Sequence, residues 1–378
     1  MEYKIHTSLT SIDGKQWDRL LGPEDPPFAQ HAFLSALEET ECAVPSTGWH
    51  PRFITVHENG EMVGGLPLYR KDHSYGEFIF DYAWADAAHR ARLPYFPKLV
   101  ACIPFSPADG RRFLVAANVD PVQVRRILLQ GARAAAEAEP ATGVHLLFLS
   151  NEEQSQLRSE GLFPRDTLQF HWLNQEYTSF DAYLALLKSK RRAQIRRERR
   201  KVVEAGVVIR IVEGVDATEA DLDSIWAFYR NTLNQYSWSQ RYLNRAFFAA
   251  AFEHLKDDIV LVLASKGDQA IAGTFNMVRD GVFYGRYWGC TEEVPFLHFE
   301  VCLYTPMELA ISRGYRVVQP GAGGQHKIAR GFLPKVIRSS HEIYIPRLNE
   351  AVEDAVRFEN QHTAQVVQAS QDWNWKKR

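Results

Sequence analysis

A glycine-rich segment near the end of the chain carries side chains well suited to chemistry. Gly321-Ala-Gly-Gly324 is followed by two basic residues and a histidine. A glycine-rich backbone lets a ligand approach closely, an imidazole can accept a proton, and lysine and arginine can hold an anion. A tight loop with charges at a helix end is the alternative. We expect His326 to act as a catalytic base and the following residues to bind substrate or cofactor: Gly323, Gly324, Lys327 and Arg330.

A second group of polar residues lies on the segment before this loop. Glu300, Tyr304 and Glu308 recur every fourth residue, so they share one face of a helix expected over 298–313. A buried carboxyl group has a raised pKa and can serve as a base. We therefore expect Glu300 to be catalytic, with Tyr287 or Tyr304 as the proton donor. The alternative for Glu300 is an ion pair with Arg286 or Arg313.

Two further side chains lie close to this helix in the sequence. His298 begins it, and Trp288 ends an aromatic strand just before it. We expect both residues to bind substrate. Cys302 is a less favoured nucleophile, because a core thiol explains a cysteine in such a helix equally well.

The elements that must position these residues form a regular order. Apolar alternation and turn residues predict strands over 259–264, 270–278 and 282–289, then a loop over 290–297, the helix, a C-cap at Gly314 and a strand over 316–319. Three antiparallel strands, a loop, a helix and a further strand form the order of the GNAT (acyl-CoA N-acyltransferase) fold. The strands would hold the helix and the glycine-rich loop at one edge.

Length and composition limit the class of protein. The chain has 378 residues with 46% hydrophobic and 12% aromatic residues, which suits two packed domains. The net charge is -2, the four cysteines show no metal-ligand spacing, and no apolar run approaches the roughly 20 residues that span a bilayer. With no signal peptide visible at the N-terminus, we expect a cytoplasmic protein without a metal.

The first half of the chain repeats the second at low similarity. At an offset of 209 positions Trp17 falls on Trp226, and the strand expected near Phe53–Val56 falls on Val262–Ser265. Strands are expected over 51–57 and 62–70, with 75–84 as a third strand or its irregular continuation. A long helix follows over 121–138 and a buried strand over 144–149. The offset predicts two copies of one α/β unit.

Lys188–Lys201 is the most unusual segment in composition. Nine of its fourteen residues are basic and one is acidic. A helix expected over 180–205 must therefore face solvent or a polyanion over most of its surface. It is either neutralised by the chain's own carboxylates or binds tRNA, a coenzyme phosphate or an anionic lipid headgroup.

The sequence around these segments resembles a known family. Lys188–Lys201 before a strand looks like the opening of the second GNAT domain of FemAB-like transferases. Gly285-Arg-Tyr-Trp-Gly-Cys290 and Pro320–Pro334 resemble a bacterial family of predicted N-acyltransferases, also described as peptidoglycan biosynthesis/recognition proteins. The resemblance covers nearly the whole chain. It implies two tandem GNAT domains, each a mixed, largely antiparallel twisted sheet flanked by helices, and transfer of an acyl or aminoacyl group to an amine.

GNAT domains hold the coenzyme pyrophosphate with a glycine-containing loop before their central helix. The second half has Cys290–Leu297 there, with Glu292 and Glu293 and no glycine, so acetyl-CoA binding is doubtful at that position. In the first half the equivalent position ends in three residues that could bind an anion before a helix, or form a surface turn: Gly110, Arg111 and Arg112.

We therefore predict an N-terminal GNAT-like domain over 1–175, a C-terminal one over 176–346, and a helical tail over 347–378. The predicted function is transfer from acyl-CoA or aminoacyl-tRNA to a small-molecule or peptide amine, such as a peptidoglycan precursor, in a cleft between the domains. A non-catalytic module that binds an anionic cell-wall precursor and an RNA-binding protein are the alternatives. The chain could also form a homo-oligomer.

Overall fold

The computed structural model describes residues 1–235 and 242–370, and the chain divides into two compact units. Unit 1 contains residues 1–167 and 336–364, and unit 2 contains residues 168–335 and the chain from 365. The three crossings fall inside the strands β9 (Phe163–Leu173) and β15 (Leu333–Ile343) and inside the helix α12 (Pro346–Ala369). This division differs from the predicted boundaries after residues 175 and 346, because one strand can belong to two units along its length. Residues 371–378 of the predicted tail lie outside the described residues.

Unit 2 contains the predicted order of strands. Four strands pair antiparallel in sequence, and the next strand pairs parallel to the last of them. They are β10 (Val207–Glu213), β11 (Ile259–Lys266), β12 (Gln269–Arg279), β13 (Val282–Cys290) and β14 (Val317–Gln319). Gly267 and Gly281 take positive φ in the two hairpin turns, where a side chain would be strained. The strands predicted over 259–264, 270–278 and 282–289 are confirmed.

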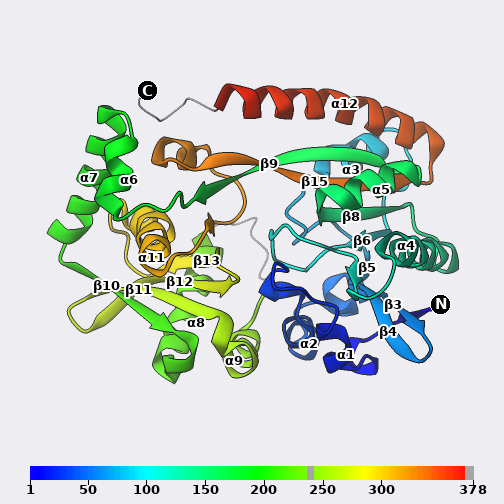
Figure 1. Cartoon of the computed structure of the whole chain (residues 1–378), viewed down its shortest axis with the longest axis horizontal. Coiled ribbons are helices and arrows are strands. Elements are labelled where there is room, and N and C mark those ends of the chain that lie inside the picture. The colour runs from blue at the N-terminus through cyan, green and yellow to red at the C-terminus, as the bar shows by residue number, and fades with distance from the viewer. Residues whose placement is uncertain (236–241, 371–378) are drawn as a thin grey trace. The chain divides into compact units, whose positions relative to one another are not determined.

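The helices of unit 2 flank this sheet, and α8 packs against β12 and β13 (Figure 1). They are α6 (Phe180–Leu186), α7 (Ser189–Glu204), α8 (Glu219–Gln235), α9 (Arg245–His254), α10 (Leu297–Phe299), a π-helical turn η6 (Glu300–Tyr304), α11 (Thr305–Arg313) and a 3-10 helix η7 (Gln325–Arg330). The helix predicted over 180–205 is two helices, because Leu187 and Lys188 adopt extended backbone between them. The helix predicted over 298–313 contains the π turn.

Unit 1 repeats this order with a more divided sheet. One set of strands is β1 (Glu2–His6), β3 (Phe53–Glu58), β4 (Glu61–Leu66) and β7 (Leu114–Val115). A second set includes β2 (Trp49–Pro51), β5 (Leu68–Lys71), β6 (Lys98–Ala101) and β8 (Gly143–Leu149). β8 pairs parallel to β6 after the helix α4 (Pro121–Ala138), as β14 pairs parallel to β13 in unit 2.

Of the two alternatives predicted for 75–84 in unit 1, a third strand or its irregular continuation, the structure has the irregular one up to residue 81. Residues 72–81 are irregular and Tyr82 begins the helix α3 (Tyr82–Arg90), while β6 supplies the strand instead. Glu77 and Asp81 are drawn inward by the ammonium group of Lys98, at 2.8 Å for Glu77. This buried ion-pair group overrides the aromatic pattern that favoured a strand.

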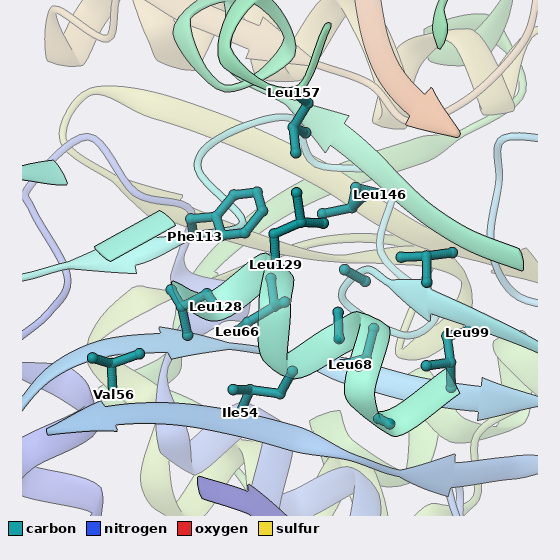
Figure 2. Close-up of a cluster of buried hydrophobic side chains, with 14 of the residues drawn as sticks. Ile54, Val56, Leu66, Leu68, Leu99, Phe113, Leu128, Leu129, Leu146 and Leu157 are labelled. Carbon is teal, nitrogen blue, oxygen red and sulfur yellow. The ribbon is translucent and has the colours of Figure 1, made fainter. Parts of the chain in front are cut away.

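The main core of unit 1 lies between α4 and the strands, and Figure 2 shows its side chains. Leu128 and Leu129 of α4 meet Ile54, Leu66 and Leu146 of the strands. These side chains are at most 1% exposed, so each contributes about 1.5–3 kcal/mol by leaving water.

The remaining helices of unit 1 cover other surfaces. They are α1 (Gly14–Asp18), α2 (His31–Glu39), α5 (Asn151–Ser159) and α12 (Pro346–Ala369). The predicted tail is thus largely α12, whose Leu348, Val352 and Val356 pack with Trp84 and Tyr95 of unit 1.

The fold is therefore a pair of tandem GNAT-type units, as predicted, each with an antiparallel set of strands followed by a helix and a parallel strand. Within the described residues no helix combines the length and the apolar character needed to cross a bilayer.

Candidate functional site

A cavity opens in unit 2 where β13 and β14 part. The two strands pair only over Val282–Tyr284 and Val317–Gln319, and the chain then diverges. The cavity has a volume of about 160 Å³. Its lining comes from β12, β13, the helix after β13 and the glycine-rich loop: Thr274, Asn276, Gly285, Arg286, Trp288, His298, Cys302, Leu303, Pro320, Ala322, Gly324, His326 and Lys327.

A β-bulge decides which side chains of β13 face this cavity. Asn276 pairs with Gly285 but Phe275 pairs with Tyr287, so Arg286 is the extra residue of β13. The bulge places Arg286 and Trp288 on the cavity side. Tyr287 faces the other side of the strand, where its ring meets those of Tyr229, Phe248 and Phe275. Tyr287, predicted as a proton donor, therefore does not line the cavity.

β12 contributes two polar side chains to the cavity wall. The Asn276 amide nitrogen donates to the Thr274 hydroxyl at 2.8 Å and to the Val260 carbonyl at 2.9 Å. Both side chains are almost fully buried. Two polar residues spaced by two in an otherwise apolar strand are the sequence signal that could have identified this wall.

The glycine-rich loop brings Lys327 into the cavity. Gly321, Gly323 and Gly324 have φ values of 86°, 69° and 91°, so the loop turns where other residues would be strained. The Lys327 ammonium donates to the Gly321 carbonyl at 2.8 Å. Burial lowers the pKa of Lys327 to about 8, and the nearby Arg286 acts in the same direction. Lys327 is therefore cationic at neutral pH, yet close to its titration range.

Two imidazoles share the cavity. The rings of His298 and His326 lie 6.0 Å apart, and His298 meets the Trp288 ring at 5.3 Å. Burial, together with nearby basic side chains, lowers the pKa of His298 to about 4. The pKa of the more exposed His326 is also lowered, mainly by burial. Both rings are neutral at pH 7, and a neutral imidazole can accept a proton.

Three other predicted residues form ion-pair networks beside the cavity. Glu300 accepts from Arg199 of α7 at 2.9 Å, and Arg199 also pairs with Glu308. Arg330 pairs with the buried Glu198 at 2.9 Å and donates to the Tyr304 hydroxyl at 2.7 Å. Burial raises the pKa of Tyr304 far above its ordinary range.

These contacts place Glu300, Tyr304 and Arg330 in ion pairs and hydrogen bonds within the protein, whereas the sequence predicted that they act in catalysis or bind a ligand. None of the three lines the cavity, because the face of the helix that carries Glu300 and Tyr304 turns toward the basic helix α7. They hold the segment that presents His298 and Cys302. Gly323 also lies off the lining, although it shapes the loop.

The basic helix α7 is neutralised in part by the chain's own carboxylates. Arg196 pairs with Asp181, Arg199 with Glu300 and Glu308, and both Arg200 and Lys201 with Glu204. Within the described residues, no carboxylate lies within ion-pair distance of the four other cations of this helix: Lys190, Arg191, Arg192 and Arg197. The first half of α7 thus keeps a basic surface.

The anion site predicted in unit 1 is engaged by the protein itself. Arg111 pairs with the buried Asp25, and Arg112 is fully buried and donates to backbone carbonyls, among them that of Ala108. Gly110 donates its amide to the Phe148 carbonyl at 3.1 Å. All three residues therefore have structural contacts where ligand contacts were predicted.

The FemAB-like family model, described as peptidoglycan biosynthesis/recognition, matches residues 8–377. The chain belongs to the FemAB-like family.

Solved structures similar to this FemAB-like protein share its fold at low identity. FemX has 13% identity and a TM-score of 0.54, with 93% of this chain and 100% of FemX covered. The C-terminal domain of a putative lysylphosphatidylglycerol synthetase from Agrobacterium fabrum has 10% identity and a TM-score of 0.58, with 92% and 96% covered. L-PGS from Bacillus licheniformis has 10% identity and a TM-score of 0.50, with 85% and 95% covered. No curated protein has a significant sequence match.

In this FemAB-like protein the cavity brings together five of the residues singled out from the sequence: Trp288, His298, Gly324, His326 and Lys327. Sequence reasoning missed Thr274 and Asn276, and it assigned Arg286 only to an ion pair. Among the described residues no group of three or more histidine, cysteine or acidic side chains is arranged to hold a metal.

Proposed function

We propose that this protein transfers an acyl or aminoacyl group to an amine, and that the reaction takes place at the cavity of unit 2. The single observation that carries the proposal is the meeting of a neutral imidazole, His326, and a cationic amine, Lys327, in the gap between β13 and β14. Such a pair supplies a base for the nucleophile and a positive charge for the carbonyl oxygen.

The proposed reaction uses His326 and Lys327 in different steps. The acceptor nitrogen attacks the acyl carbon, and the bond from that carbon to the donor oxygen or sulfur breaks. His326 takes the proton that the nitrogen loses and returns it to the departing atom. The Lys327 ammonium stabilises the negative charge that develops on the carbonyl oxygen.

Aminoacyl-tRNA is the favoured donor in this proposal. The loop before α10 has no glycine, and it carries Glu293 and a second glutamate, Glu292, that pairs with Lys266; the charge of Glu293 would repel the pyrophosphate of acyl-CoA at the place where GNAT domains hold it. Lys190, Arg192 and Arg197 give α7 cations that can meet a phosphate backbone. The family description, peptidoglycan biosynthesis/recognition, supports a peptidoglycan precursor as the acceptor.

A transfer assay tests the proposal. The full chain is incubated with tRNA charged with labelled amino acids, or with labelled acetyl-CoA, and a soluble peptidoglycan precursor that carries a side-chain amine. We expect His326→Ala to lower kcat by at least about a hundredfold, because a positioned base contributes about 10²–10⁴. His254→Ala, on an exposed histidine of α9, is the matched control and should leave kcat unchanged.

Three outcomes would contradict the proposal. If His326→Ala transferred the group at the full rate, His326 would not be the base. If Glu300→Gln abolished transfer while the variant stayed folded, the chemistry would lie beside α7 instead. Precursor binding without transfer from either donor would favour the alternative of a non-catalytic binding module.

A further inference from the structure

One strand of unit 2 leaves a long sheet edge without a partner strand. β10 comes last in the order of strands and pairs with β11 in an antiparallel register that runs unbroken from Val207 to Glu213 (Figure 1). Among the described residues, no second strand pairs with the other side of β10, and no turn or loop backbone hydrogen-bonds to it. A row of unpaired N–H and C=O groups is a template for a further strand.

The other edge strands are short or carry residues that hinder pairing. β1 contains Glu2 and Lys4, β2 has three residues and contains Pro51, and β7 has two residues. Charged side chains, proline and short length all protect a sheet edge from pairing with another chain. β10 has seven residues, with neither proline nor lysine, and its register contains no bulge. It therefore lacks the protection that the other edges have.

Apolar side chains accompany this free edge. Val208 is 64% exposed and Ile211 is 38% exposed, and Val203 at the end of α7 is 71% exposed. Ile209 and Ile211 also border a groove of about 690 Å³ that lies between β10, α6, α7 and α11. A strand added at this edge would therefore remove apolar surface from water in addition to pairing backbone groups.

The charges of β10 are already compensated within unit 2. The exposed guanidinium of Arg210 pairs with Asp221 of α8, and Glu213 pairs with Arg313 of α11. Asp221 also accepts a hydrogen bond from the Thr218 amide at 2.9 Å, which fixes its carboxylate at the start of α8. The edge therefore presents no uncompensated charge that would repel an approaching strand.

The sequence of β10 is complementary to itself. Val208-Ile-Arg-Ile-Val212 reads the same in both directions. Opposite residues of two antiparallel strands point to the same face, so a two-fold axis at Arg210 places Val208 opposite Val212 of the partner subunit. In the same register Ile209 lies opposite Ile211 of the partner subunit. Pairs of β-branched side chains in these positions stabilise antiparallel strands.

We propose that this protein forms a two-fold symmetric dimer in which β10 pairs antiparallel with β10 of a second copy, in the register centred on Arg210. The pairing satisfies the free backbone groups of both strands and covers Val208 and Ile211. The two Arg210 side chains meet at the axis, each accompanied by its own Asp221. The dimer goes beyond the proposed transfer reaction and does not depend on it, since no residue of β10 lines the cavity beside β13.

Sedimentation velocity of the full chain through the micromolar range tests the dimer. We expect a monomer–dimer equilibrium that shifts with concentration. Val208→Lys should raise the dimer Kd by at least about tenfold, because a lysine blocks a strand edge and the change occurs twice across the axis. Val122→Lys, at a valine of α4 that is also exposed, is the matched control and should leave the Kd unchanged.

Disulfide cross-linking tests the register. Residues at the axis have Cα atoms about 4.5–5.5 Å apart, which suits a disulfide, so Arg210→Cys chains should form a covalent dimer when diamide is added. Val208→Cys is the matched control on the same strand. Its two cysteines would be offset by about 13 Å along the strands, so it should cross-link at least about tenfold more slowly. The unsubstituted chain accounts for reaction at the native cysteines.

A charge substitution tests the contact at the axis. Asp221→Asn can still accept from the Thr218 amide, but it leaves two uncompensated guanidinium groups facing each other. The variant should dimerise more weakly than the unsubstituted chain at low ionic strength, and added salt should reduce the difference. Arg210→Gln in the same chain removes the repulsion and should restore the dimer.

These experiments also define what would overturn the inference. A chain that stays monomeric through the micromolar range has a different partner at β10 or none. A dimer that a folded Val208→Lys variant retains at full strength is formed through another surface. Cross-linking of Val208→Cys as fast as that of Arg210→Cys, or a dimer that Asp221→Asn leaves unchanged at low ionic strength, would contradict the register centred on Arg210.

Discussion

Units 1 and 2 share one arrangement of strands but use the gap beside the parallel pair differently. In unit 1 the parallel pair is β6 and β8, and in unit 2 it is β13 and β14. In unit 1 the strand ends at β6 and the chain after it packs as a buried segment. In unit 2, β13 continues as a strand and borders a cavity of about 160 Å³. One topology thus serves packing in unit 1 and a candidate site in unit 2.

The segment after β6 in unit 1 is packed like a core. Ile103, Phe105 and Ala108 are at most 2% exposed, and Gly110 hydrogen-bonds to β8 through the Phe148 carbonyl. Arg112 donates to backbone carbonyls, and Glu153 accepts from the Arg112 and Phe113 amides at 2.8 Å. Most polar groups here hydrogen-bond within the chain, although the Ser106 hydroxyl and Nε of Arg112 have no hydrogen-bond partner among the described residues.

The lining of the unit 2 cavity has the opposite character. It gathers two cations and two imidazoles without a lining carboxylate among the described residues, and it uses a bulge to add Arg286. Polar side chains kept for binding reduce stability where apolar packing would increase it. The GNAT-type framework alone therefore does not make a site; the side chains that fill or line the gap do.

The largest expected effect comes from truncating a buried side chain in the packed segment after β6 of unit 1. Phe105→Ala should lower the free energy of unfolding by about 3–5 kcal/mol, because the ring is buried against Trp49. Urea unfolding measures the loss, and kcat should not change. Phe358→Ala on the exposed face of α12 is the control and should change stability by less than about 0.5 kcal/mol. A Phe105→Ala variant of full stability would contradict the packed role of this segment.

A smaller effect, on activity and not on stability, is expected in the cavity of unit 2. Lys327→Met should lower kcat about 10²–10³-fold, as the loss of one donor to a developing oxyanion does. Its stability should stay equal or rise, because a buried cation is replaced by an apolar side chain.

A pH profile sharpens this prediction. Activity should fall as the pH rises through the pKa of Lys327 near 8, and Lys327→Arg should move that fall to higher pH. Lys335→Met, on an exposed lysine of β15, is the matched control. A large loss of stability in Lys327→Met with normal kcat would assign the lysine to packing, and the contrast between the units would disappear.

The smallest effect concerns acid stability of unit 1. His145 and His341 are buried, with ring nitrogens 2.9 Å apart, between Trp84 and the charges of Lys98, Asp81 and Arg165. Burial lowers the pKa of His145 to about 3 and lowers that of His341 as well.

The unfolded chain therefore binds protons that the folded unit rejects. Stability should be present well above pH 6.5 and fall as the pH drops through it, by about 1.6 kcal/mol for His145 between pH 6.5 and 5. Urea unfolding at pH 7.5 and 5 measures the change. His145→Asn should flatten the slope, and the exposed His89→Asn should not. A slope that His145→Asn leaves intact would locate the acid sensitivity elsewhere.

Prediction from sequence succeeded where local pattern and local contacts agree. The hairpins of unit 2 have turn glycines at Gly267 and Gly281, and α11 ends at Gly314 with the expected positive φ. The glycine-rich loop could be recognised from its composition, because few other structural elements require so many glycines in a row. For 75–84 the sequence left a strand or an irregular continuation open, and the irregular form is adopted because Lys98, distant in sequence, pairs with Glu77 and Asp81.

The candidate site was only partly predictable for a similar reason. Tyr287 and Trp288 are neighbours in the sequence, and which of them faces the cavity depends on a bulge that the pattern does not reveal. Glu300 and Tyr304 share a helix face as predicted, but that face meets α7. Helical spacing predicts which residues share one face of a helix, but it does not predict which surface that face contacts.

By itself, the sequence determined the fold class, the tandem arrangement, the basic character of α7 and the glycine-rich loop with His326 and Lys327. These follow from periodicity, turn chemistry and composition, which act over a few residues. Only the tertiary structure decided that Arg286 joins the cavity, that Arg112 is buried in unit 1 and that Glu300 neutralises Arg199. Burial and pairing of charges depend on segments far apart in the chain, and no local pattern states which of them will meet.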